Sequence, residues 1–70
     1  MKIRISTYTN KDDGIESRIY LNNGSAFPYV VEFWDTDANQ MAFSKTVKRL
    51  QVAEDEARSF CGEDYIYDVL

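Results

Sequence analysis

The sequence predicts an α+β domain in which one α-helix packs on one face of a small antiparallel β-sheet of three to four strands. Three observations support this fold class. Apolar and polar residues alternate with a period of two over residues 2–8 and 15–22, as in half-buried strands. Two apolar runs, 29–34 and 41–47, flank a polar turn and extend the sheet. Between residues 49 and 61 the apolar positions recur at steps of three and four, which is typical of a helix.

The chain has 70 residues and contains no repeats, low-complexity segments or linkers, so we expect one domain, residues 1–70. This length is near the lower limit at which a single core suffices without disulfides or a metal. We therefore expect modest stability, or stability that a partner increases.

The first two strands are predicted to form a hairpin. Ile3 and Ile5 share one side of the first strand, and Ile19 and Leu21 share one side of the second. Between the strands, the stretch TNKDDG is polar and rich in turn-forming residues. We expect a mobile loop there.

Two turn lengths compete for the hairpin signal at Asn23-Gly24. A two-residue turn over this dipeptide places Ile19 and Leu21 beside Val30 and Trp34. A three-residue turn ending at Gly24 moves the pairing by one residue, which turns every side chain of one strand to the other face. We favour the longer turn because it collects the larger apolar set, which is Ile19, Leu21, Phe27, Tyr29, Val31 and Phe33.

The remaining elements follow from turn and helix signals. A fourth strand returns along the third, with Met41 and Phe43 toward the core. We expect the helix to begin near residue 49, because a start at Lys45 would place positive charges in its first turns, and Gly62 is a natural stop. The terminal residues 63–70 form either a fifth strand or a packed extended tail.

This arrangement predicts a core between the helix and one sheet face. Its members are Ile3, Ile5, Ile19, Leu21, Tyr29, Val31, Phe33, Met41 and Phe43 on the sheet, and Leu50, Ala53, Ala57 and Phe60 on the helix.

Composition limits the chemistry that the chain could perform. It has no histidine and one cysteine, so the usual nucleophile and base pairs, and the usual zinc ligands, cannot be assembled. The carboxylates lack the spacing of a calcium loop, and the glycines are isolated rather than grouped in a phosphate-binding loop. We expect no catalytic residue, metal or cofactor, and we interpret Cys61 as a small buried packing residue.

The net charge and the apolar runs of the sequence limit the partners and the location that we expect. The net charge of -4 disfavours wholesale phosphate binding, which needs a basic surface. No apolar run has the length of a signal peptide core or a membrane span, and a single cysteine cannot form an internal disulfide. We expect a cytoplasmic protein that does not enter a membrane.

The sheet face without the helix carries the candidate site. It is predicted to hold tyrosine, tryptophan and arginine, the residue types that dominate binding hot spots. The candidate binding residues are Arg4, Arg18, Tyr20, Val30, Glu32 and Trp34, with Lys2 and Tyr8 on the same face.

Two partners fit this face. Trp34, Tyr20 and Val30 could form the desolvated centre of a protein interface, with Glu32 and the arginines at its rim. Alternatively, the aromatic rings stack on bases while Lys2, Arg4 and Arg18 hold phosphates. The strand, turn, strand, helix order of residues 29–60 resembles the three-stranded sheet plus helix of integrase-arm DNA-binding domains, a resemblance of topology that covers under half of the chain and implies the second partner.

Two further interpretations remain open. Ten acidic residues could present a negative surface to a basic groove of a nucleic-acid-handling protein, as small inhibitors do. Alternatively, Trp34 and Tyr20 pack under the C-terminal YIY segment or in a homodimer. The acidic residues are Asp12, Asp13, Asp35, Asp37, Glu54, Asp55, Glu56, Glu63, Asp64 and Asp68.

The sequence thus predicts a non-catalytic protein-binding module, an inhibitor or adaptor that docks on a larger protein through the aromatic and arginine face or through an acidic surface. Nucleic-acid binding through the open sheet face is the alternative.

Overall fold

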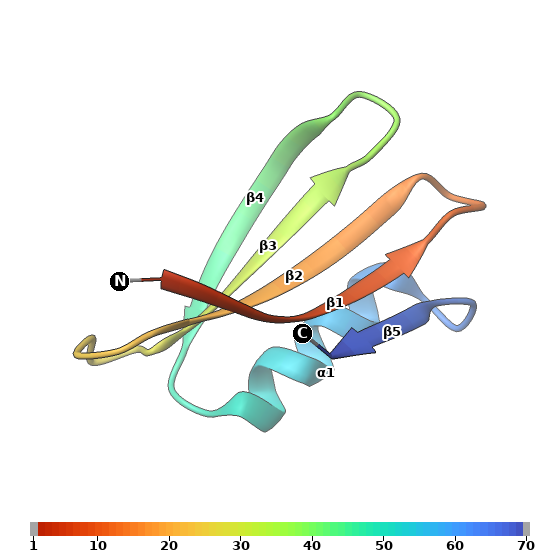
Figure 1. Cartoon of the computed structure of the whole chain (residues 1–70). Helices are drawn as coiled ribbons and strands as arrows, with labels where there is room; N and C mark the ends of the chain where they lie inside the picture. The colour runs from red at the N-terminus through yellow and green to blue at the C-terminus, as the bar shows by residue number, and fades with distance from the viewer. Residues whose placement is uncertain (1, 70) are drawn as a thin grey trace.

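The computed structural model describes residues 2–69 and has the predicted α+β architecture. A five-stranded antiparallel sheet, in the order β4-β3-β2-β1-β5, carries one helix on one face (Figure 1). The elements are β1 (Lys2–Asn10), β2 (Ile15–Asn22), β3 (Tyr29–Asp35), β4 (Gln40–Val47), α1 (Leu50–Cys61) and β5 (Ile66–Val69).

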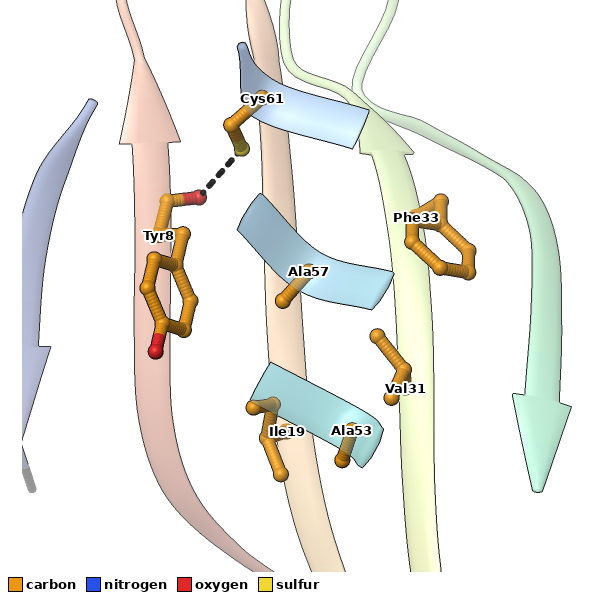
Figure 2. Close-up of a cluster of buried hydrophobic side chains, with 7 residues drawn as sticks. All are labelled: Tyr8, Ile19, Val31, Phe33, Ala53, Ala57 and Cys61. Carbon is orange, nitrogen blue, oxygen red and sulfur yellow. Dashed lines mark hydrogen bonds between the residues drawn. The ribbon is translucent and has the colours of Figure 1, made fainter. Parts of the chain in front are cut away.

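The core lies between α1 and the middle of the sheet (Figure 2). The helix contributes Ala53, Ala57 and Cys61, whose small side chains let its backbone approach the strands closely. From the sheet come Tyr8, Ile19, Val31 and Phe33, all buried. The helix starts within one residue of the predicted position, and at its end Gly62 N–H donates to the carbonyl of Arg58 at 2.9 Å.

The grouping of Ile19 and Leu21 with Tyr29, Val31 and Phe33 is confirmed, but the predicted turn is too short. Phe27, which we predicted in the same set, lies in the loop and is 45% exposed. Ile19 is paired with Val31 and Leu21 with Tyr29, so these side chains share the helix face. Asn22 N–H donates to the carbonyl of Pro28 at 2.7 Å, which closes a loop over residues 23–28. The loop is longer because a β-turn and a serine hydroxyl contact within it satisfy its own backbone groups.

A β-bulge in β1 changes which residues face the helix. Arg4 is paired with Tyr20 but Ser6 with Ile19, so Ile5 is an extra residue in the ladder. Beyond the bulge the alternation is reversed, and Tyr8 faces the helix and is 3% exposed. The prediction that Tyr8 lies on the helix-free face is therefore wrong.

A second bulge lies in β4. Phe33 is paired with Phe43, but Trp34 is paired with Met41, so Ala42 is the extra residue. Phe43 keeps the predicted side and stacks on Phe33 with ring centroids 4.5 Å apart. Met41 lies on the opposite face, beside Trp34, and its predicted place in the core is wrong.

Several predicted core residues are exposed, because the buried cluster lies only between α1 and the middle of the sheet. Ile3 at the start of β1, Phe43 on β4 and Leu50 at the start of α1 are exposed. Of the expected core, the buried part is confined to the central strands and the helix.

The first turn is shorter than predicted because β1 continues to Asn10. It covers Lys11 to Gly14, and Asp13 N–H donates to Oδ1 of Asn10 at 3.2 Å. The carbonyl of Gly14 accepts from Thr36 N–H at 2.8 Å. The turns that follow β1 and β3 are thus joined at one end of the sheet.

The C-terminal segment forms a strand, and the packed-tail alternative is wrong. β5 pairs with β1 from Ser6 to Thr9. Tyr67 lies opposite Tyr8, with ring centroids 4.7 Å apart.

Within residues 2–69, no helix is long and apolar enough to span a membrane.

Candidate functional site

The sheet face opposite α1, called the outer face below, brings all six predicted binding residues together. The register pairs Arg18 with Glu32, and Tyr20 with both Val30 and Arg4. Trp34 lies opposite Glu16 on β2 and opposite Met41 on β4. Residues that face each other in neighbouring strands point to the same side, so these side chains form one surface.

Glu32 lies at the centre of the outer face. It is 8% exposed, and its carboxylate accepts hydrogen bonds from Lys2 Nζ at 2.8 Å and from Trp34 Nε1 at 3.0 Å. Burial by itself would raise the pKa of Glu32, but the bonds from Lys2 and Trp34 outweigh it and lower the pKa. Glu32 is thus a buried anchor and not the rim residue that we predicted.

Arg18 covers one side of the Trp34 ring. Its guanidinium carbon lies 4.1 Å from the ring centroid, and its Nε bonds to the carboxylate of Glu16. Burial would lower the pKa of Arg18, but the hydrogen bond to Glu16 outweighs it and raises the pKa. A cation in this position adds about 0.5–1 kcal/mol of attraction when exposed, and more when dehydrated. The stack holds Trp34 in one orientation.

The charges of the outer face are nearly all paired within the face. Lys2 bonds to Glu32 and lies 4.6 Å from the centroid of the Tyr20 ring, while Arg18 bonds to Glu16. Among residues 2–69, Arg4 is the cation on this face without a carboxylate partner. A face whose cations are held by its own carboxylates offers little positive charge to phosphates.

Met41 and Thr7 are among the members of the outer face that sequence reasoning missed. Met41 is 43% exposed beside Trp34, and the bulge at Ala42 that places it there leaves no pattern in the sequence. Thr7 reaches this face because of the bulge at Ile5, opposite Arg18. Its hydroxyl is buried without a hydrogen-bond partner in the described part of the chain.

The C-terminal segment does not cover Trp34. β5 lies at the β1 edge of the sheet, and Trp34 is on β3, separated from it by β2 and β1 (Figure 1). The interpretation in which Trp34 and Tyr20 pack under the YIY segment is therefore wrong. Their remaining exposed surface is open in the single chain.

Acidic residues do not form a single surface. Asp13 and Asp37 lie on the two joined turns at one end of the sheet. On α1, Glu56 accepts from Lys45 Nζ at 2.9 Å, and Asp55 pairs with Arg58. Part of the negative charge is therefore neutralised within the chain.

The structure offers little for small-molecule chemistry. Residues 2–69 contain no pocket and no cluster of three or more side chains suited to hold a metal. Cys61 is buried, as predicted; its thiol contacts the carbonyl of Tyr8 at 3.3 Å, and burial raises its pKa (Figure 2). The outer face is the strongest candidate surface.

The chain was compared with protein families, curated proteins and solved structures. No family model, curated protein or solved structure matched the chain.

Proposed function

We propose that the protein is a non-catalytic binding module that docks on a larger protein through the outer face. The observation that carries this proposal is the exposed Met41 beside the half-buried Trp34, whose indole is already stacked against Arg18. Tryptophan and arginine are the residue types most enriched among interface hot spots, and methionine adapts to irregular apolar partners. An inhibitor or adaptor role fits a chain of 70 residues that acts by occupying a surface.

Preorganisation supports the proposal. The indole N–H of Trp34 is held by Glu32 and one side of its ring is held by Arg18, so little side-chain freedom remains to be lost on binding. Each rotamer-rich side chain that is fixed in advance saves about 0.5–1.5 kcal/mol of association free energy. The exposed edge of Trp34 is thus presented in a binding-ready position.

Charge favours protein over nucleic acid as the partner. Stacking on a base needs a free aromatic face and nearby cations, but Arg18 covers one face of Trp34, and Lys2 and Arg18 are bound to carboxylates. Arg4 alone would release few counterions. Nucleic-acid binding stays the alternative and is an outcome of the test.

The test compares the binding of a protein partner and of nucleic acid to the same 70-residue chain. A photoreactive residue replacing Met41 would capture the partner in cells, and one replacing the exposed loop residue Phe27 serves as control. The purified partner is then titrated against the wild-type chain and Trp34→Ala, with amide shifts recorded. We expect shifts on β2 and β3 around Trp34, and a loss of at least about 2 kcal/mol, or about thirtyfold in Kd, for Trp34→Ala.

Short single- and double-stranded oligonucleotides are titrated in parallel. Shifts at Arg4, Arg18 and Trp34 with oligonucleotides alone would overturn the protein-partner proposal. A complex that is indifferent to Trp34→Ala but lost on charge reversal of Glu54, Asp55 and Glu56 would instead assign binding to the acidic surface.

A further inference from the structure

β5 buries little of its surface. Among the described strands it is the one whose residues are all exposed, and Ile66 and Val69 reach 58% and 70%. None of its four residues belongs to the buried core. The stability that a strand gains from docking grows with the apolar area that it removes from water, so the gain for β5 is small.

β5 also has fewer supports than the strand at the other edge of the sheet. Among the described helices and strands it lies against β1 alone, which it pairs from Ser6 to Thr9 (Figure 1). β4, at the opposite edge, lies against both β3 and α1. Its Lys45 Nζ donates to the carboxylate of Glu56 on α1 at 2.9 Å. The helix therefore holds β4 in place but not β5.

The chain is anchored immediately before β5. The side chain of Asn10 donates to the carbonyl of Cys61 at 2.7 Å, and the ring of Tyr65 packs on that of Tyr8 with centroids 5.2 Å apart. Beyond these anchors, β5 itself adds its ladder with β1 and the contact between the rings of Tyr67 and Tyr8. The docking of residues 66–69 is thus separable from that of the segment before them.

A buried hydroxyl at the pairing of β1 with β5 favours release. Thr7 is 8% exposed and lies opposite Arg18 on β2 and Asp68 on β5. Its Oγ1 is buried without a hydrogen-bond partner within residues 2–69. A hydroxyl that has lost its bonds to water without replacing them costs free energy. Water reaches Thr7 from the β5 side once β5 has left, so opening removes this cost.

We propose that β5 is a detachable strand, which leaves and rejoins the edge of β1 as a unit while the rest of the domain stays folded, and that the unpartnered hydroxyl of Thr7 favours its release. When docked, β5 covers the edge of β1 from Ser6 to Thr9, and no described strand lies beside Lys2 to Arg4. When β5 is released, the backbone groups of this edge are open from Lys2 to Thr9. The strand thus controls how much of the edge is accessible.

This device does not depend on the proposed function of the outer face. Trp34 and Met41, which carry that function, lie on β3 and β4 and not on the strands that separate. A failure of either proposal is therefore distinguishable from a failure of the other.

The experiment is native-state hydrogen exchange of the full chain, followed by NMR at urea concentrations below the unfolding transition. Amides bonded between β1 and β5 should be at least about tenfold less protected than those bonded between β2 and β3. Their exchange should hardly depend on urea, because a local opening exposes little surface. Amides bonded between β4 and β3 are the control at the other edge and should be more protected than those of β5.

Substitutions of Tyr67 test whether the fold survives without β5. Proline lacks the amide donor and disrupts strand pairing, so Tyr67→Pro should abolish the docking of β5. The chain should stay folded, and its β2–β3 amides should lose no more protection than β5 had in the wild type. Tyr67→Thr keeps the amide and the strand preference but loses the ring contact with Tyr8, so β5 should open about two- to tenfold more often.

A valine at position 7 tests the role of the hydroxyl. Thr7→Val keeps the branched shape and removes the unpartnered oxygen, so opening of β5 should become about fivefold rarer or more. Thr9→Val is the matched control on the same strand and face. The hydroxyl of Thr9 already donates to Glu16 at 3.2 Å, so its removal should not make opening rarer.

Three results would overturn the proposal. The first is protection of the β5 amides equal to that of the β2–β3 amides, with the same dependence on urea. The second is a Tyr67→Pro chain that is unfolded. The third is equal exchange of β5 in the wild type and in Thr7→Val, which would refute the role of Thr7.

Discussion

The side-chain amide of Asn10 donates a hydrogen bond to the backbone carbonyl of Cys61 at 2.7 Å. This bond joins the last residue of β1 to the last residue of α1, which are 51 positions apart in the chain. The last carbonyls of a helix have no partner within it, so a buried helix end must find one elsewhere. Asn10 supplies that partner, and it also accepts from the backbone N–H of Asp13 in the adjoining turn.

Removing the Asn10 amide should destabilise the fold. Asn10→Ala leaves the carbonyl of Cys61 buried without its donor, which costs about 1–3 kcal/mol of unfolding free energy. Urea titration followed by circular dichroism measures the change. Asn23→Ala in the exposed β2–β3 loop is the matched control and should stay within about 0.5 kcal/mol of wild type. Equal losses in the two variants would contradict the structural role of Asn10.

A buried and an exposed isoleucine allow the assigned core to be tested with the same substitution. Ile19 is 0% exposed beneath α1, and Ile66 is 58% exposed on β5. Ile19→Val should cost about 0.5–1.5 kcal/mol, because it removes a buried methylene and leaves a small cavity. Ile66→Val should change the unfolding free energy by less than about 0.5 kcal/mol. The midpoints of denaturant unfolding, at equal slope, give the comparison, and a larger loss at Ile66 would refute the assigned core.

Glu32 should make stability depend on pH on the acidic side. Its pKa is lowered in the folded chain, mainly by the bonds from Lys2 and Trp34 acting against burial. A lowered folded pKa means that the contribution is complete above the unfolded value of about 4.5 and is lost as the pH falls through the folded pKa. Glu32→Gln should therefore flatten the fall in stability below about pH 4.5, and the fall should persist in the exposed control Glu63→Gln.

Lys2, which forms the ion pair with Glu32, should contribute to stability with the opposite dependence on pH. The bond to Glu32 raises the pKa of Lys2, so its contribution is present below the unfolded value of 10.5 and fades as the pH rises through the folded pKa. Unfolding curves recorded from about pH 3 to about pH 11 would test both limbs. If stability falls identically at acidic pH in wild type and Glu32→Gln, the hydrogen bonds to Glu32 are not the cause of that fall.

Gly14 and Gly24 provide a matched pair for backbone strain and close approach. Both have positive φ, 65° and 88°, so alanine at either position should cost about 1 kcal/mol. A Cβ at Gly14 would also lie 2.2 Å from Oδ2 of Asp37, whereas one at Gly24 meets nothing within 4 Å. Gly14→Ala should therefore destabilise more than Gly24→Ala, as measured by thermal unfolding.

The additional destabilisation by Gly14→Ala, compared with Gly24→Ala, can be tested separately. In an Asp37→Gly background the obstructing carboxylate is gone, and the cost of Gly14→Ala should fall to that of Gly24→Ala. An excess that survives in this background would trace the loss to the backbone and not to the contact between the two turns.

Much of the fold was predictable because its signals are local. β2 has the predicted bounds, and α1 starts and ends within one residue of its prediction, since alternation, helical spacing and a terminal glycine act over a few neighbouring residues. The six candidate binding residues share one face for the same reason. The face on which each of these side chains lies follows from the alternation along its strand, because the ladder is regular there.

Predictions failed where the ladder is irregular or where a contact is distant. Tyr8 and Met41 were assigned to the wrong faces because one extra residue, Ile5 or Ala42, reverses the parity beyond it. A bulge is stabilised by what the bulged strand meets in its neighbours and above it, and nothing in the strand's own pattern marks it. The position of Glu32 was missed similarly, because its donors Lys2 and Trp34 converge only when β1 and β3 flank β2.

The sequence by itself determined that this chain forms an antiparallel sheet with one helix, and that Trp34 lies on the face without the helix. The tertiary structure decided what surrounds Trp34. β5 pairs with β1 at the far edge and does not cover the indole. Met41 lies beside it, and Arg18 and Glu32 fix its orientation. The physical reason is range: periodicity records the preferences of near neighbours, whereas edge choice, bulges and partly buried ion pairs depend on residues that meet only after the strands have assembled.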